Sequence, residues 1–120
     1  MTDKIVVLST CADREEADRL ARTLVESGLA ACVSVIPQIS SYYRWKGALE
    51  CSEEYLLLMK SSRELFGELR RRLETAHSYE LPEVLAIPVL DGSPNYLNWL
   101  QGELRRAGGE DASGDNEQSV

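Results

Sequence analysis

The fold is decided by residues 39–60, ISSYYRWKGALECSEEYLLLMK. The spacing predicts a strand over 39–46, because successive side chains of a strand point to opposite faces. One face of it carries Ile39, Tyr43 and Trp45. The other carries Ser40, Tyr42, Arg44 and Lys46. Residues 47–50 predict a turn, and 53–60 return as the partner strand, so the stretch predicts a long β-hairpin with aromatic side chains on one arm.

The returning strand is apolar on both of its faces, since Tyr55 to Met59 form an uninterrupted apolar run. If helices cover one face of its sheet, the other face exposes a row of apolar side chains. Such a patch is larger than most soluble monomers tolerate. We therefore predict that the chain self-associates through the open sheet face, and that the long hairpin reaches a neighbouring subunit.

Signals on either side of the hairpin complete the order of elements. Further strands are predicted over 4–9, 30–36 and 84–89, with Pro37 kinking or bulging the chain after the second. Helices are predicted over 14–27, from Ser61 to about Ala76, and from Pro94 to the Gly108–Gly109 pair. The first two begin with the spacing of a capping box, Asp13 with Glu16 and Ser61 with Glu64.

The order β-α-β-β-α-β followed by a helix predicts an α+β fold, a ferredoxin-like antiparallel sandwich with two helices on one face. We expect a single domain over 1–106. Residues 107–120 are small, acidic and lack apolar anchors, so we expect a disordered tail there.

Composition excludes several classes of protein. The chain has 120 residues, of which 43% are hydrophobic and 28% charged, as in one ordinary globular domain. Neither a membrane-length apolar run nor a signal-peptide pattern is present, so we expect a cytoplasmic protein with no membrane partner. The net charge is −7, and the only basic run, Arg70 to Arg72, lies on a predicted helix, so nucleic acid is not expected as a partner.

Metal-binding candidates are few. The three cysteines, Cys11, Cys32 and Cys51, have no C-x-x-C spacing, and an odd number argues against a disulfide framework. The one histidine, His77, ends the second helix, where it either caps the helix or serves as a metal ligand or a polar group of a pocket. Cys11 lies before the first helix and is either an inert thiol or a second ligand. Cys32 suits a small buried position and Cys51 a surface one.

A second polar set consists of Arg44, Lys60, Tyr79, Glu80 and Glu83. Lys60 ends a buried strand and Glu83 precedes the next one. One interpretation is an ion pair that holds subunits in register. The other is a pocket for a small anion or carboxylate.

Five stretches of the sequence resemble the CutA divalent-cation tolerance family, in the order and near the spacing of that family. They are Leu29–Val33, Ser41–Gly47, Met59–Ser61, His77–Glu83 and Tyr96–Trp99, within a resemblance that covers about residues 4–104. The resemblance implies a ferredoxin-like subunit in a compact homotrimer, a link to tolerance of divalent cations, and binding of copper. It also implies that Tyr43, Trp45, Lys60, Tyr79 and Glu83 line a cleft between subunits.

The family's copper ligands carry over only in part. The resemblance implies a cysteine at the end of the first strand, where this chain has Ser9 with Cys11 two residues later. It implies two adjacent histidines near the end of the second helix, where this chain has Ala76 and His77. His77 therefore matches, and Cys11 is the candidate replacement for the cysteine because alternate residues of a strand share a side.

Two functions follow. The first is a cytoplasmic homotrimer that responds to divalent metal ions and binds copper or another divalent cation weakly through His77 and Cys11. The second is a trimeric small-molecule sensor or scaffold that uses the cleft between subunits. We do not expect an enzyme, because no nucleophile lies in a recognisable pair with a base.

Overall fold

The computed structural model describes residues 1–108. It contains one sheet of four strands, three α-helices and a short 3₁₀ helix. In chain order the elements are β1 (Lys4–Cys11), α1 (Arg14–Glu26), β2 (Cys32–Trp45), β3 (Ala48–Ser62), η1 (Arg63–Leu65), α2 (Phe66–Ala76), β4 (Leu85–Pro88) and α3 (Pro94–Glu103). This is the predicted α+β order. The prediction of a disordered tail lies, from residue 109 onward, outside the described residues.

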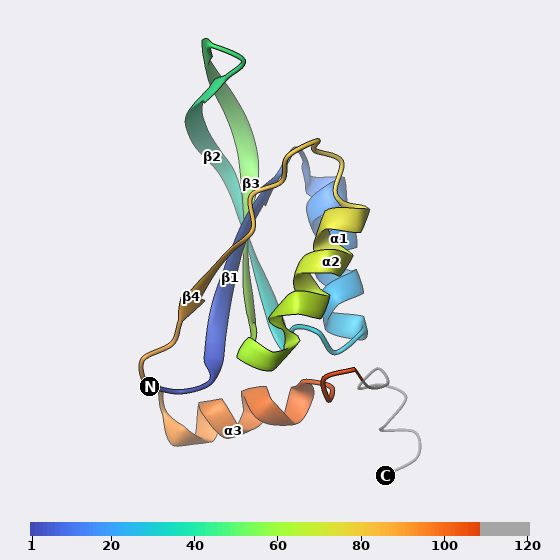
Figure 1. Ribbon diagram of the computed structural model, residues 1–120, viewed down its shortest axis with the longest axis vertical. Helices are drawn as coiled ribbons and strands as arrows, with labels where there is room; N and C mark the ends of the chain where they lie inside the picture. The colour runs from blue at the N-terminus through green and yellow to red at the C-terminus, as the bar shows by residue number, and fades with distance from the viewer. Residues whose placement is uncertain (109–120) are drawn as a thin grey trace.

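The sheet has the strand order β2-β3-β1-β4, and all of its neighbouring strands are antiparallel. Figure 1 shows α1 and α2 side by side on one face of the sheet, with α3 across the end near the N-terminus. The β2–β3 hairpin extends well beyond the other two strands at the opposite end. The strands of the hairpin are therefore longer than β1 and β4, the other two strands of the sheet, as the sequence predicted.

The hairpin differs from its prediction at the turn. We expected a turn over 47–50, but β3 already begins at Ala48, because Lys46 and Gly47 both adopt positive φ angles of 51° and 84°. Two such residues make the two-residue turn whose twist matches the strands. The predicted irregularity at Pro37 is confirmed: the register shifts between Ile36 and Ile39, and Gln38 has a φ of 58°.

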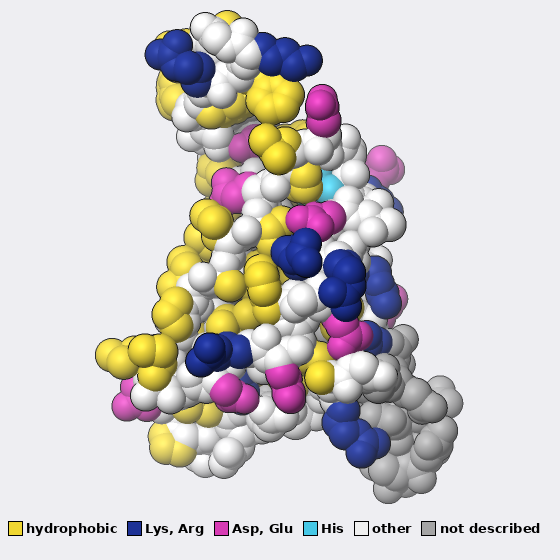
Figure 2. Space-filling view, in the orientation of Figure 1, with side chains coloured by type: hydrophobic (Ala, Val, Ile, Leu, Met, Phe, Trp, Pro, Cys, Tyr) yellow, Lys and Arg dark blue, Asp and Glu magenta, His cyan; other side chains and the backbone are white. Residues whose placement is uncertain are grey.

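The two faces of the sheet have different environments. Toward the helices, Val7, Leu57 and Met59 are fully buried against α1 and α2. On the other face, register aligns mostly apolar side chains into rows that no helix of residues 1–108 covers. One row consists of Ser34, Leu58, Leu8 and Leu85, and the next of Cys32, Lys60, Val6 and Ile87. Leu85 and Ile87 are 57% and 46% exposed. Figure 2 shows apolar side chains along the sheet, away from α1 and α2.

The predicted capping box at Ser61 is wrong. Ser61 still belongs to β3, and its buried hydroxyl donates a hydrogen bond to the Leu29 carbonyl over 2.7 Å. A 3₁₀ turn follows, and α2 begins only at Phe66 without a side-chain cap. The box at α1 is partly confirmed: Asp13 accepts from the Glu16 N–H, but the Glu16 side chain turns to other donors.

The last helix is shorter than predicted. It ends at Glu103 instead of near Gly108, because the following backbone leaves the helix to make tertiary contacts. The Arg105 N–H donates to the Gly28 carbonyl over 2.9 Å, and its guanidinium pairs with Glu68. Within residues 1–108, no helix combines the length and the apolar character that crossing a membrane requires.

Candidate functional site

A closed polar network lies where β1 ends, beside the start of α1 and the end of α2. Its centre is Glu16, which is buried within the first turn of α1. The Glu16 carboxylate accepts hydrogen bonds from the Ser78 N–H at 2.8 Å and the Ser78 hydroxyl at 2.9 Å. Burial alone would raise the pKa of this carboxyl, but the bonds from Ser78 and Ala12 and the nearby His77 outweigh it and lower the pKa below its usual range. Glu16 therefore fixes the segment after α2 onto α1.

His77 is held in the same network by both of its ring nitrogens. It is the C-cap of α2, and its side chain is fully buried. Nε2 lies 2.7 Å from the Thr10 carbonyl, and Nδ1 accepts from the Tyr79 N–H at 3.0 Å. A carbonyl can only accept, so these bonds assign the proton to Nε2. Of the two readings of the sequence, the capping position is the one the backbone shows, although the ring bonds β1 instead of the helix carbonyls.

Cys11 lies close to this network but is buried as a thiol. Its side chain has no solvent exposure, and Sγ donates to the Asp13 carbonyl at 3.8 Å. Burial, followed by the Glu16 and Asp13 carboxylates, raises its pKa from 9.0 to about 11. The thiolate is the form that binds metals, and this environment opposes its formation.

These residues do not fit a preformed copper centre. Both His77 nitrogens are engaged in hydrogen bonds, and the Cys11 thiol keeps its proton near neutral pH. Ser9, on the same face of β1, is a buried hydroxyl. Across residues 1–108, no group of three or more histidine, cysteine or acidic side chains is placed to hold a metal ion.

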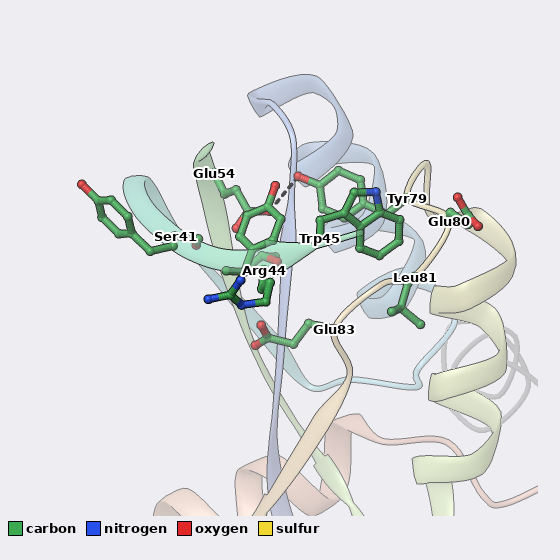
Figure 3. A pocket seen from close by; sticks show the side chains of 11 residues that line it. Ser41, Arg44, Trp45, Glu54, Tyr79, Glu80, Leu81 and Glu83 are labelled. Carbon is green, nitrogen blue, oxygen red and sulfur yellow. Dashed lines mark hydrogen bonds between the residues drawn. The ribbon is translucent and has the colours of Figure 1, made fainter. Parts of the chain in front are cut away.

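An open pocket of about 640 Å³ lies next to the network, between the hairpin and the segment that follows α2 (Figure 3). The hairpin contributes residues 41–45, and the segment after α2 contributes 79–81 and Glu83. Thr10, near the end of β1, and Glu54 of β3 also line it, and both are buried. The Tyr79 hydroxyl donates to Glu54 Oε2 over 2.7 Å, and burial together with this bond raises the pKa of Tyr79 above its usual range.

The structure brings together four of the five residues predicted to line a cleft. Tyr43, Trp45, Tyr79 and Glu83 all line the pocket. Lys60 does not, because it lies six residues along β3 from Glu54, about 20 Å at the rise of a strand. Neither Lys60 nor Glu83 forms an ion pair within the part of the chain that the structure describes. Arg44 and Glu80 also line the pocket.

Sequence reasoning missed two central residues. Glu16 was identified only as a capping residue, although the three-residue spacing from Asp13 did indicate that it lies at the helix start. Glu54 was not singled out, because its partner Tyr79 is 25 residues away and no local pattern reports that contact. Its only signal was its place beside the apolar run, where an acidic residue is unusual.

Comparison with known proteins gives a consistent result. Residues 5–103 match the family model described as CutA1 divalent ion tolerance protein. The divalent-cation tolerance protein CutA of Thermus thermophilus is 42% identical over 96 residues, 80% of this chain and 93% of that protein. The chloroplastic CutA of Arabidopsis thaliana is 40% identical over 101 residues, 84% of this chain and 56% of that protein.

Solved structures agree with the fold. The crystal structure of CutA from Xylella fastidiosa superposes with a TM-score of 0.84 at 38% identity, over 87% of this chain and all of that one. The Thermus thermophilus structure gives a TM-score of 0.83 at 39% identity, over 85% of this chain and 99% of that one. The family model spans most of the described residues, and the sheet and helices are those of these structures. The chain therefore belongs to the CutA1 divalent ion tolerance protein family.

Proposed function

We propose that this chain works as a homotrimer in the response to divalent metal ions. The observation that carries this proposal is the match of residues 5–103 to a family described by divalent ion tolerance. The bacterial relative of similar length bears the same description in its name. The proposed role is one of binding and not of catalysis, since the single histidine has both nitrogens engaged in structural hydrogen bonds.

The trimer is supported by the uncovered sheet face. Mostly apolar rows that include Leu8, Leu58 and Leu85 lie there, and no helix of the described residues covers them. The hairpin projects far enough beyond β1 and β4 to contact another subunit (Figure 1). Light scattering after size-exclusion chromatography tests this directly. We expect a mass three times the 13.4 kDa of one chain, and a stable monomer at micromolar concentration contradicts the proposal.

Binding of copper or another divalent cation at His77 and Cys11 is weak in this proposal. Each donor is occupied: the His77 nitrogens by hydrogen bonds and the Cys11 sulfur by its proton. Calorimetric titration of metal-free protein with Cu(II) and Zn(II) tests this, beside His77→Ala and Cys11→Ser. We expect dissociation constants above the micromolar range that His77→Ala weakens further. Binding that is indifferent to both changes places the metal elsewhere, and tight binding that His77→Ala abolishes contradicts the weakness of this site.

We further propose that the protein acts in the cytoplasm. All three cysteines are free, including the half-buried Cys32 and the exposed Cys51, as expected in a reducing compartment. Relatives are named for other locations, among them a chloroplastic protein of Arabidopsis thaliana and a periplasmic one of Archaeoglobus fulgidus. Cell fractionation with antibody detection tests this, and recovery outside the cytoplasmic fraction contradicts it.

A second candidate function is ligand sensing, favoured by one observation. The pocket of about 640 Å³ is of a size that holds small molecules, and it gathers four of the predicted cleft residues. Thermal shift of the intact protein against a panel of small cations, anions and neutral compounds tests it. No shift with any compound removes this candidate and leaves the metal response unaffected.

A further inference from the structure

The pocket between the hairpin and the segment after α2 is acidic. Glu54, Glu80 and Glu83 line it against a single basic residue, Arg44. Lys60, which the sequence had suggested as part of an anion site, lies about 20 Å away along β3. The charges of this pocket therefore favour a cation and oppose the small anion or carboxylate that was one of the two interpretations of the sequence.

Glu54 is the most informative of these residues, because it is only 6% exposed and yet forms no ion pair within residues 1–108. Its Oε2 accepts from the Tyr79 hydroxyl at 2.7 Å. Its other oxygen has no hydrogen-bond partner among the same residues. A carboxylate removed from water is costly unless it is paired and hydrogen-bonded. Glu54 thus offers a buried negative acceptor to whatever enters the pocket.

Aromatic rings line the same pocket as this carboxylate. Tyr43, Trp45 and Tyr79 line the pocket, and Figure 3 shows Trp45 and Tyr79 on the same side of it. The Tyr43 hydroxyl is 2.8 Å from Ser52 Oγ, which fixes its ring. The Trp45 ring already attracts an ammonium, since Lys46 Nζ lies 5.7 Å from its centroid. Aromatic faces combined with a carboxylate are the recognition chemistry of organic cations.

The geometry distinguishes an organic cation from a bare metal ion. The three carboxylates of the pocket do not converge, since within residues 1–108 no three acidic, histidine or cysteine side chains are grouped as metal ligands. A pocket of about 640 Å³ instead suits a molecule of several heavy atoms. The Glu54 oxygen that does not accept from Tyr79 can accept a further hydrogen bond, for which a primary ammonium supplies an N–H donor and a quaternary ammonium does not.

We propose that this pocket binds a small organic cation with primary ammonium groups, such as a linear alkyl diamine. One ammonium donates to Glu54 beside Tyr79, which bonds the same carboxylate, and the rest of the molecule lies along the other aromatic side chains that line the pocket, Tyr43 and Trp45. The second lies toward Glu83 at the rim. This inference rests on the second candidate function, because it names the ligand class of that pocket, and it is independent of any metal site at His77.

Tryptophan fluorescence of the intact protein tests the proposal. Trp99→Phe leaves Trp45 as the only tryptophan. The probes are 1,4-diaminobutane, tetramethylammonium, succinate and Mg²⁺ at matched ionic strength. We expect a saturable change with the diamine, at least tenfold weaker binding of tetramethylammonium, and none with succinate or Mg²⁺. Binding of succinate but not of the diamine overturns the cation proposal and supports ligand binding in the pocket. No fluorescence change with any probe contradicts both the cation proposal and the ligand-sensing function.

Charge variants sharpen the test. Glu54→Gln keeps an acceptor for Tyr79 and removes only the charge, so we expect diamine binding to weaken about tenfold or more. Arg44→Gln is expected to tighten it severalfold, because it removes the one cation of the pocket. Glu74→Gln, at an exposed position of α2, is the matched control and should leave diamine binding unchanged.

Two outcomes of this series overturn the proposal. The first is binding that Glu54→Gln and the rim variant Glu83→Gln both leave unchanged. The second is failure of the diamine to bind native protein together with an altered oligomeric mass for Glu54→Gln. The latter result shows instead that a cationic side chain of a second copy fills the pocket.

Discussion

The two faces of the sheet are built from the same strands and yet have opposite environments. Neighbouring residues of β3 show this most directly: Leu57 is fully buried beneath α1 and α2, while Leu58 lies on the open face and is partly exposed. Both are leucines, so hydrophobicity alone does not distinguish them. Helices α1 and α2 cover the first face, whereas no helix among residues 1–108 covers the apolar side chains of the open face. The first face stabilises the subunit, and the second is available for contacts between subunits.

The largest effect is expected on the covered face. Leu57→Ala leaves a cavity among fully buried neighbours, so we expect it to lower the free energy of unfolding by about 2–5 kcal/mol. Urea denaturation at one fixed protein concentration measures this. Val25→Ala, at a 41% exposed position of α1, is the control and should change stability by less than about 0.5 kcal/mol. Equal losses for the two variants would mean that the helices do not seal this face.

The next effect is expected on the open face. Leu58→Glu places a charge in the middle of an apolar row and removes the roughly 1.5–3 kcal/mol that burial of a leucine contributes to an interface. We expect the subunit to stay folded by circular dichroism while its mass by light scattering falls to 13.4 kDa. Val25→Glu, an equivalent change at an exposed position of α1, should leave the assembly intact. Unchanged mass for Leu58→Glu would contradict assembly through this face.

The difference between the faces could be anticipated from sequence because it depends on local patterns. Alternation along 39–46 and the apolar run from Tyr55 to Met59 identify the hairpin and its two-sided strand, and the structure confirms both. The turn at Lys46 and Gly47 was placed too late, because only Gly47 indicates a positive φ and Lys46 gives no such signal. The capping role of Ser61 failed for a different reason: its hydroxyl bonds Leu29, 32 residues away.

The site was predicted less completely than the fold, because its partners are distant in sequence. Four predicted cleft residues do meet in one pocket, but Lys60, which the family resemblance grouped with them, lies about 20 Å from Glu54 along β3. The Glu16–Ser78 and Glu54–Tyr79 contacts join elements 62 and 25 residues apart. Nothing in the local pattern shows that both ring nitrogens of His77 form hydrogen bonds with backbone groups, one in β1 and one in the segment after α2.

Stability at alkaline pH is expected to depend on Cys11, which is buried on the covered face. The Cys11 pKa is raised from 9.0 to about 11 in the folded protein, so between these values the unfolded chain loses a proton that the folded chain keeps. The associated stability is complete below pH 9 and is lost as pH rises to 11, on the order of 2 kcal/mol. Urea titrations from pH 8 to 11 measure it. Cys11→Ala should flatten the decline, and an identical decline in this variant would assign it to other groups.

The smallest effect is expected for Ser9, one of two buried serines on the covered face. Ser9 has a fully buried hydroxyl with no hydrogen-bond partner among residues 1–108, whereas the equally buried Ser61 hydroxyl donates to Leu29. Ser9→Ala removes an unsatisfied polar atom, so we expect it to raise the free energy of unfolding by about 1 kcal/mol. Ser61→Ala leaves the Leu29 carbonyl without this donor and should lower it by about 1–3 kcal/mol. Chemical denaturation of both variants measures the pair. Changes of opposite sign in the free energy of unfolding would show that hydrogen bonds, as well as apolar packing, specify the covered face. A loss of stability in both variants would mean that the Ser9 hydroxyl does have a hydrogen-bond partner.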